Sequence, residues 1–394
     1  MKVKSLEATC LRGVKFMRPR DRVLDVVEHR EPDRVPLDLF ITPTAYLNVK
    51  RYLGVQDEDV VKWGWVEPLK VCERVLERLH IDVRRVYFKR PKGWVPRRLP
   101  GGVLEDEWGR RFKVIGEYYE IIHYPLAGAV EVEDVEDYPY PDPYAPGRTE
   151  GLRRDARRLF EETGYAVMGF PMLPSMDMFD PGLCLMGMKS FLLNLKLNPR
   201  VVEAYMDKMC ELLMGFYDNF LGEVGEYVQI IYGTSLDSGH QRGMLISPQD
   251  WRKIFKPRLK RLYSFIKGKA PNVKIFFHSC GAIRPIINDL IEIGVDILNP
   301  IQPLAEGMDP ESLKEEFGEK ICFHGGIDVQ RVMSSLGTLE DVEQEVKGKI
   351  KALAPGGGYI LASSHNLQAD SSPEKIVAMY DYARKHGEYP IKIS

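Results

Sequence analysis

The chain has 394 residues, of which 44% are hydrophobic and 28% are charged, so it can bury at least one full-sized core. This balance excludes an intrinsically disordered, a collagen-like and a coiled-coil protein. The 55 Lys and Arg residues against 57 Asp and Glu residues leave a net charge of -2, so no overall positive field favours nucleic acid or an anionic membrane, and we expect a small ligand.

The first residues argue against a secretory leader. Residues 1–7 (MKVKSLE) carry charge where a signal peptide needs an apolar core, and no later stretch approaches 18 uncharged apolar residues. We therefore expect a cytoplasmic protein that does not bind a membrane. The six cysteines are too sparse for a disulfide framework, so in a reducing compartment they stay free or bind metal.

Short β-branched or aromatic runs alternate with longer amphipathic segments, which is typical of βα units around a parallel sheet. Because a closed barrel leaves no edge strand to protect, eight such runs predict a single (β/α)8 TIM barrel over residues 1–394. The predicted strands are 34–40, 82–88, 165–171, 228–232, 273–279, 297–300, 321–326 and 358–363. The predicted helices include 68–79, 200–221, 248–266, 284–293, 339–353 and 373–386.

Residues 91–146 interrupt this alternation between the second and third predicted strands. Two aromatic-rich alternating runs, 108–115 and 118–124, predict a β-hairpin insertion. The acidic, proline-rich stretch 131–146 that follows predicts an extended connector. The insertion covers the site or contacts a partner, or it is a surface hairpin without either role.

The active site of a parallel barrel lies at the carboxyl ends of its strands, and the fifth predicted strand ends in His278, Ser279, Cys280 and Gly281. Side chains two positions apart on a strand share a face, so His278 and Cys280 can bind one ion. Imidazole and thiolate are both ligands of Zn²⁺, and His365 is the best candidate by position for a third ligand. Zinc with an open fourth position would hold a bound thiol as thiolate. The alternative is a hydrogen-bonded histidine beside an inert buried cysteine.

Other polar residues near strand ends are candidates for catalysis or for binding a cofactor. Asp237 follows the fourth strand in a Gly-rich loop, where it orients a metal-bound histidine, acts as a general acid or caps the loop. His324 precedes Gly325 and Gly326, whose missing side chains would let a ligand approach the backbone; otherwise His324 supports or packs against the site. Comparable loops hold Asn299, Gln302, Asp328 and Gln368.

Together these residues resemble the uroporphyrinogen decarboxylase superfamily, and within it the corrinoid (cobalamin)-dependent methyltransferases. The resemblance runs over nearly the whole chain and implies a (β/α)8 barrel with an N-terminal helical extension. The segments that carry it are 22–36, which resembles the family's opening helix and first strand, then 79–82, the Asp237 loop with 245–248, 278–281, 325–328, and the pair His365 and Asn366.

The decarboxylases of this family hold the porphyrinogen acetate groups with arginines soon after the first strand and with an aspartate after the second. Here residues 40–46 contain no arginine, and residues 86–89, at the end of the second strand, contain no aspartate. The resemblance to the decarboxylases therefore lacks the apparatus for a polycarboxylate tetrapyrrole.

The methyltransferases instead bind zinc with a His-x-Cys pair and a distant cysteine on the last strand, and they activate the thiol of coenzyme M or a related acceptor against methyl-cobalamin. Here His365 stands where the distant cysteine would fall, so the third ligand is His365 or a residue from elsewhere. The resemblance implies zinc at His278 and Cys280, with Asp237 and His324 as catalytic residues. The residues expected at the cofactor are Gly325, Gly326, Asn299 and Gln302.

The activity implied by this resemblance is transfer of a methyl group between a small substrate, such as a methyl ether, a thiol or a folate, and a cobalamin cofactor. The chain carries no Asp-x-His-x-x-Gly motif, so the corrinoid would come with a partner protein or as a free cofactor. A homodimer is compatible with the sequence. Two alternatives stay open: a decarboxylase with altered substrate recognition, and a corrinoid or tetrapyrrole binder without catalysis.

Overall fold

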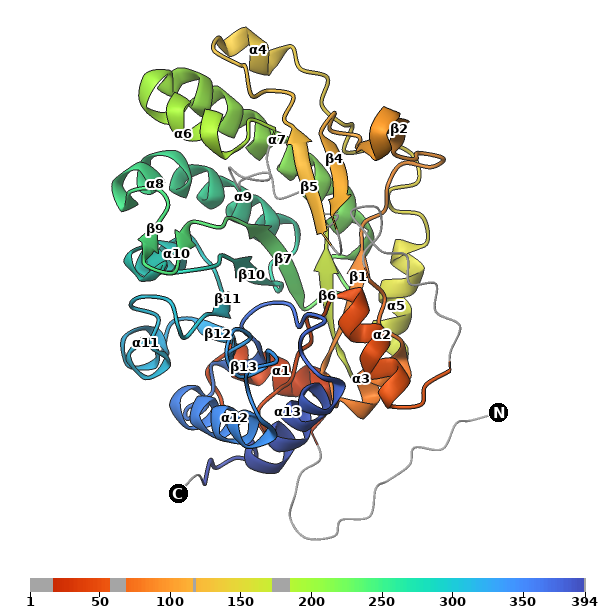
Figure 1. Cartoon of the computed structure of the whole chain (residues 1–394), viewed down its shortest axis with the longest axis vertical. Helices are drawn as coiled ribbons and strands as arrows, with labels where there is room; N and C mark the ends of the chain where they lie inside the picture. Colours follow the sequence, from red (N-terminus) through yellow and green to blue (C-terminus); the bar gives the residue numbers. More distant parts are fainter. Residues whose placement is uncertain (1–16, 57–68, 116–117, 172–184, 393–394) are drawn as a thin grey trace.

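A seven-stranded parallel sheet forms the centre of the molecule, and helices surround it (Figure 1). The computed structural model describes residues 17–56, 69–115, 118–171 and 185–392, so residues 1–7 lie outside the described part. Seven of the predicted strands appear here. In sheet order they are β1 (Val83–Tyr87), β6 (Ala166–Phe170), β7 (Ile230–Ser235), β10 (Lys274–His278), β11 (Ile297–Ile301), β12 (Cys322–Ile327) and β13 (Tyr359–Ser363).

Residues 34–41, which we call the first segment, take the eighth position in the barrel wall. They join the two edges of this sheet. Leu37 forms a parallel bridge with Leu361 of β13, and its carbonyl oxygen accepts an N–H from Asp82, next to β1, at 2.9 Å. The predicted regular strand at 34–40 is wrong in this respect. Pro36 has no N–H, and the N–H of Leu37 donates to the Asp82 carboxylate at 2.8 Å instead of to a strand. The fold is nevertheless the predicted TIM barrel.

The carboxylate of Asp82 is the buried anchor of this closure. It is inaccessible to solvent and accepts hydrogen bonds from Arg22 at 2.7 Å and from two nitrogens of Arg34 at 2.8 Å each, besides the N–H of Leu37. Because a buried charge is tolerated only when it is paired and hydrogen-bonded, this cluster needs all of its partners.

The N-terminal helix α1 (Pro19–Val27) closes the amino end of the barrel, as the expected helical extension. Its side chains Val23, Val26 and Val27 are buried in one cluster with the first inward-facing residue of most strands. Side chains alternate along a strand, so the next inward positions lie closer to the carboxyl end. The first inward residues in this cluster are Val83, Ala166, Ile230, Ile297, Cys322 and Ile360.

The predicted helices are present, with three corrections. The helix predicted at 68–79 is the shorter α3 (Glu73–Arg78), and residue 68 lies outside the described part. The single helix predicted at 248–266 is two helices, α8 (Pro248–Ile254) and α9 (Lys256–Lys269). They are broken at Phe255, because Pro257 has no N–H to continue the first helix. The segment 284–293 begins as a 3-10 turn before α10 (Ile287–Glu292). No helix in the described ranges is long and apolar enough to cross a bilayer. The remaining helices are α2 (Pro43–Tyr52), α4 (Val132–Glu136), α5 (Leu152–Glu162), α6 (Met188–Leu197), α7 (Pro199–Val224), α11 (Pro310–Phe317), α12 (Leu339–Leu353) and α13 (Pro373–His386).

The insertion between β1 and β6 is larger than the hairpin expected for it. It forms a four-stranded antiparallel sheet in the order β2 (Arg97–Leu99), β3 (Val103–Glu105), β4 (Arg111–Ile115) and β5 (Tyr118–His123), beside α6 and α7 in Figure 1. The connector is not wholly extended, because a capping box of Glu131 and Asp134 starts the short helix α4. Buried Arg148 ties the insertion to the barrel through a 2.7 Å ion pair with Glu107.

Replacing Asp82 by Asn should strongly destabilise the fold. The substitution keeps the shape of the side chain but leaves the buried Arg34 without its counter-charge and Arg22 with Asp33 alone, which typically costs about 3–5 kcal/mol. Equilibrium unfolding in urea measures the loss. The matched control is Asp381→Asn, which breaks an ion pair with Arg78 whose two side chains are 45% and 42% exposed, and which should cost less than about 1 kcal/mol. Equal losses for the two variants would contradict the anchoring role of Asp82.

Candidate metal centre at the carboxyl end of the barrel

The end of β10 places His278 and Cys280 at the mouth of the barrel. Phe276 lies in the cluster inside the barrel, so His278, two residues further on, points inward as well. After Cys280 the chain turns at Gly281, whose φ is +84°. A Cβ at Gly281 would lie 2.4 Å from the backbone carbon of Gly239, so only glycine permits this close approach of the two loops.

Three potential metal donors converge at this point: the Asp237 carboxylate, the His278 imidazole and the Cys280 thiol. Each offers a donor atom within 4.8 Å of the other two. The Nε2 atom of His278 lies 3.5 Å from the Sγ atom of Cys280 and 3.5 Å from Oδ1 of Asp237. The His278 side chain is 21% exposed and that of Asp237 is 37% exposed, so the group is open to solvent. The predicted pair is therefore brought together, with Asp237 beside it.

This spacing fits a zinc ion. Zn–S bonds of about 2.3 Å and Zn–N bonds of about 2.0–2.1 Å at a tetrahedral angle separate the two donor atoms by about 3.5 Å. That separation matches the distance between Cys280 Sγ and His278 Nε2. Nitrogen, sulfur and carboxylate oxygen are all accepted zinc ligands, so the donor set suits this ion chemically as well.

Backbone and side-chain hydrogen bonds hold the two loops of this group together. Oδ1 of Asp237 accepts the backbone N–H of Cys280 at 2.8 Å, and Oε1 of Gln302 accepts the N–H of Gly281 at 2.8 Å. The Nε2 atom of Gln302 points to Cys280 Sγ at 3.4 Å. A donor aimed at sulfur stabilises the negative charge of a thiolate. Gln302, expected at a cofactor, thus lies against the metal donors.

His365, the residue predicted from position as the third ligand, lies outside this group of donor atoms within the described part of the chain. Its environment is nevertheless shared with the group. Burial lowers the pKa of His365, the neighbouring His278 lowers it further, and Asp237 acts in the opposite direction. The neutral imidazole that these effects favour is the form that binds metals. The structure therefore adds Asp237 as a candidate for the third ligand, and the role of His365 stays a prediction.

The ring of His278 continues into a row of polar side chains inside the barrel. Its Nδ1 atom lies 2.6 Å from Oδ1 of Asn299, and Nδ2 of Asn299 lies 2.7 Å from Nδ1 of His324. Asn299 belongs to β11, so its expected position in a loop is wrong. His324 is 1% exposed, and burial lowers its pKa although Asp38 acts in the opposite direction.

Two members of this row, Asp38 and Arg85, were missed by sequence reasoning. Asp38 accepts a hydrogen bond from Nη2 of Arg85 at 2.7 Å and lies 3.1 Å from Nε2 of His324. A charged residue inside the apolar run 35–40 was the available signal, since aspartate is seldom buried without a partner. Nothing local to either residue indicates that the two meet across the barrel.

The backbone geometry at positions 325 and 326 explains why both residues are glycine. They have φ values of +107° and +95°, which side-chain-bearing residues rarely adopt. Protein atoms occupy the adjacent space: a Cβ at Gly326 would lie 3.1 Å from the hydroxyl oxygen of Tyr359, and that hydroxyl donates to the carbonyl of Gly325 at 2.9 Å. Their role at a cofactor stays a prediction.

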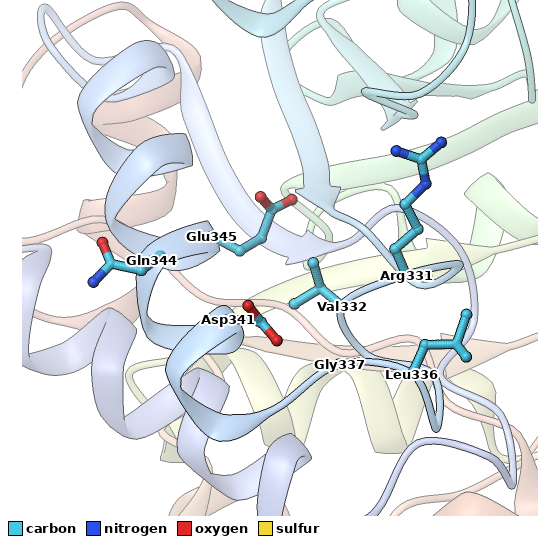
Figure 2. Close-up of a pocket in the computed structure, with 7 residues that line it drawn as sticks. All are labelled: Arg331, Val332, Leu336, Gly337, Asp341, Gln344 and Glu345. Atoms are coloured by element: carbon cyan, nitrogen blue, oxygen red, sulfur yellow. The ribbon is translucent and has the colours of Figure 1, made fainter.

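A hollow of about 590 Å³ lies between the loop after β12 and α12 (Figure 2). The loop after β12 and the start of α12 line it. None of the candidate metal, catalytic or cofactor residues is among its lining residues, which are Arg331, Val332, Leu336, Gly337, Asp341, Gln344 and Glu345.

Comparison with known proteins yields a family and a shared fold. The family model described as uroporphyrinogen decarboxylase (URO-D) matches residues 124–386. No curated protein matches the chain. Among solved structures, a methyltransferase from Methanosarcina mazei superposes with a TM-score of 0.64 at 16% sequence identity, over 94% of this chain and 99% of that one.

Xylanases superpose less well on this chain. An intracellular xylanase from Thermoanaerobacterium saccharolyticum gives a TM-score of 0.37 at 9% identity, over 64% of this chain and 85% of that one. Xylanase 10B from Thermotoga maritima gives 0.37 at 10% identity, over 66% and 85%.

The pH dependence of folding should reveal the buried neutral state of His324. Because burial lowers the pKa of His324 in the folded protein, the unfolded chain binds more protons once the pH falls below about 6.5. Stability is thus complete above that pH and decreases towards pH 5. The variant His324→Gln should show a smaller decrease in the urea midpoint of the metal-free protein between pH 7.5 and pH 5. The variant His240→Gln, at an exposed position, should keep the wild-type dependence. An unchanged slope in His324→Gln would contradict this assignment.

Proposed function

The chain belongs to the uroporphyrinogen decarboxylase family, and on that premise we propose that it is a zinc-dependent methyltransferase of a corrinoid system. It would move a methyl group between a small substrate, such as a methyl ether, a thiol or a folate, and a cobalamin cofactor. The observation that carries this proposal is the convergence of Asp237, His278 and Cys280 at the mouth of the barrel. The fold shared with the methyltransferase from Methanosarcina mazei supports it.

In this proposal His278 and Cys280 hold the zinc ion, and Asp237 or His365 completes the protein ligands. Asp237 is favoured by its distance of 3.5 Å from the His278 nitrogen, and His365 by the position at the end of the last strand. When bound, zinc supplies a Lewis acid that holds a thiol as thiolate near neutral pH. The side-chain N–H of Gln302 would stabilise negative charge on the sulfur of Cys280. The side chains of His278 and Asp237 are partly exposed, so a substrate could reach the ion from solvent.

The arrangement of charges inside the barrel disfavours the decarboxylase alternative. The buried guanidinium of Arg85 is already paired with Asp38 and packs 4.6 Å from the ring centre of Phe40. It is therefore not a free cation for the acetate groups of a porphyrinogen. Arg34 of the first segment is likewise paired, with Asp82, and residues 35–46 contain no further arginine.

The corrinoid is proposed to arrive on a partner protein, because this chain lacks the motif that holds it. The small-molecule donor or acceptor would reach the zinc ligands from the open carboxyl end, since α1 closes the amino end. His324 is buried, and we therefore place it behind the reacting groups rather than among them.

Metal analysis of single variants tests the zinc ligands. Purified protein should hold close to one zinc ion per chain, measured by plasma mass spectrometry, and His278→Ala and Cys280→Ala should each weaken zinc binding at least about 100-fold. Asp237→Ala and His365→Ala together identify the third ligand, because only the variant that lacks a true ligand loses zinc. Cys72→Ser is the matched control, since Cys72, like Cys280, is a partly buried cysteine. Zinc-free wild-type protein, or full zinc binding by Cys280→Ala, would refute the centre.

Turnover assays separate the three functional alternatives. With zinc-loaded protein and methyl-cobalamin, a thiol or folate acceptor should cause demethylation of the corrinoid, which is followed by absorbance, and Cys280→Ala should abolish it. Corrinoid binding without turnover, unchanged in Cys280→Ala, would instead indicate a carrier. Release of CO₂ from uroporphyrinogen would indicate a decarboxylase.

A further inference from the structure

A continuous row of hydrogen bonds crosses the interior of the barrel behind the metal donors. It begins at Arg85 on β1 and passes through Asp38 of the first segment, His324 on β12 and Asn299 on β11 to His278 on β10. The four distances are 2.7, 3.1, 2.7 and 2.6 Å in this order. Every member faces inward, and the three central side chains are no more than 4% exposed.

The direction of each hydrogen bond in this row follows from its acidic end. An ionised carboxylate only accepts, so Asp38 requires an N–H on Nε2 of His324. A neutral imidazole carries one proton, which leaves Nδ1 of His324 as an acceptor for the amide nitrogen of Asn299. The amide oxygen of Asn299 then faces Nδ1 of His278 and requires an N–H there. Nε2 of His278 is left with its lone pair.

The acidic end of the row is itself firmly held. Although burial alone would raise the pKa of Asp38, Arg85 and His324 outweigh it and keep the carboxyl ionised. The second oxygen, Oδ1 of Asp38, accepts the backbone N–H of Leu39 at 2.8 Å. His324 lies edge-on between two rings, 5.6 Å from the centre of Phe40 and 5.0 Å from that of Phe276. The row therefore has one stable hydrogen-bond polarity.

We propose that Asn299, His324 and Asp38 are positioning residues that hold the His278 ring in its Nδ1–H form and aim the Nε2 lone pair at the metal. This inference rests on the proposed zinc centre. Nε2 is the atom that lies 3.5 Å from both Cys280 Sγ and Asp237 Oδ1, so the lone pair points into the donor group. Partners behind a ligating histidine typically contribute about 10–100-fold to metal affinity.

The alternative is that these hydrogen bonds only pair buried polar atoms in the core. The two possibilities differ in what they predict for His278. A row that only fills the core would affect stability when broken, while the tautomer of His278 and its metal affinity would stay the same. A positioning row changes both of these, and it does so from His324, whose ring does not touch the metal donors.

Nuclear magnetic resonance of the metal-free protein with ¹⁵N-labelled histidine gives the tautomer directly. His278 should carry its proton on Nδ1, and the signal is assigned by its loss in His278→Gln. In Asn299→Leu and His324→Leu the ring should populate the Nε2–H form. His324→Gln retains an acceptor towards Asn299 and a donor towards Asp38, so it should keep the wild-type tautomer. A wild-type His278 ring protonated on Nε2 would overturn the inference.

Competition with a chromophoric chelator measures the second consequence, the affinity for Zn²⁺. Asn299→Leu and His324→Leu should bind zinc about 10–100-fold more weakly than wild type, with recovery in His324→Gln. Ser363→Ala is the matched control, because Ser363 is 1% exposed, lies on the neighbouring strand β13 and has a hydroxyl without a partner among the described residues. Wild-type affinity in both leucine variants would overturn the inference and leave the zinc centre standing. A wild-type protein that binds no zinc would refute the proposed function, and the tautomer would still decide the positioning role.

Discussion

The buried carboxylate of Asp82 is the contact on which the rest of the molecule depends. By accepting the N–H of Leu37 and the guanidinium groups of Arg22 and Arg34, it joins the first segment to β1 where a regular ladder is interrupted at Pro36. The same contact sets how the following residues of the first segment and of β1 are aligned with each other. Asp38 follows Leu37 by one position and Arg85 follows Asp82 by three, and the two meet inside the barrel.

Alternation of side chains then sorts the interior into layers. The first inward residues are apolar and pack on α1, while the next include Arg85, Asn299 and His324. His278 ends β10 at the mouth, in register with Asn299 on the neighbouring strand. A polar layer between an apolar floor and a set of metal donors places hydrogen-bond partners behind the donors rather than among them. The barrel thus brings polar side chains from distant parts of the chain to the Nδ1 side of His278.

Much of this could be predicted from local patterns, because strand runs and the His-x-Cys spacing are local properties. The donor atoms of His278 and Cys280 do lie close together, as their spacing along the strand predicts. The failures have non-local causes. The regular first strand was wrong because Asp82, 45 residues from Leu37, takes its N–H. Likewise, no sequence pattern reveals that Asp38 meets His324 across 286 positions.

Because α1 covers the amino end of the barrel, it restricts how reactants reach the interior. Among the described elements, the carboxyl end is then the side from which reactants enter. If methyl transfer takes place at this entrance, the small substrate and the corrinoid carrier would both arrive from the same side, so the small substrate would have to bind first, beneath the carrier. The methyl group would then pass directly between the two reactants, and an ordered sequential kinetic pattern would be the natural outcome of this architecture.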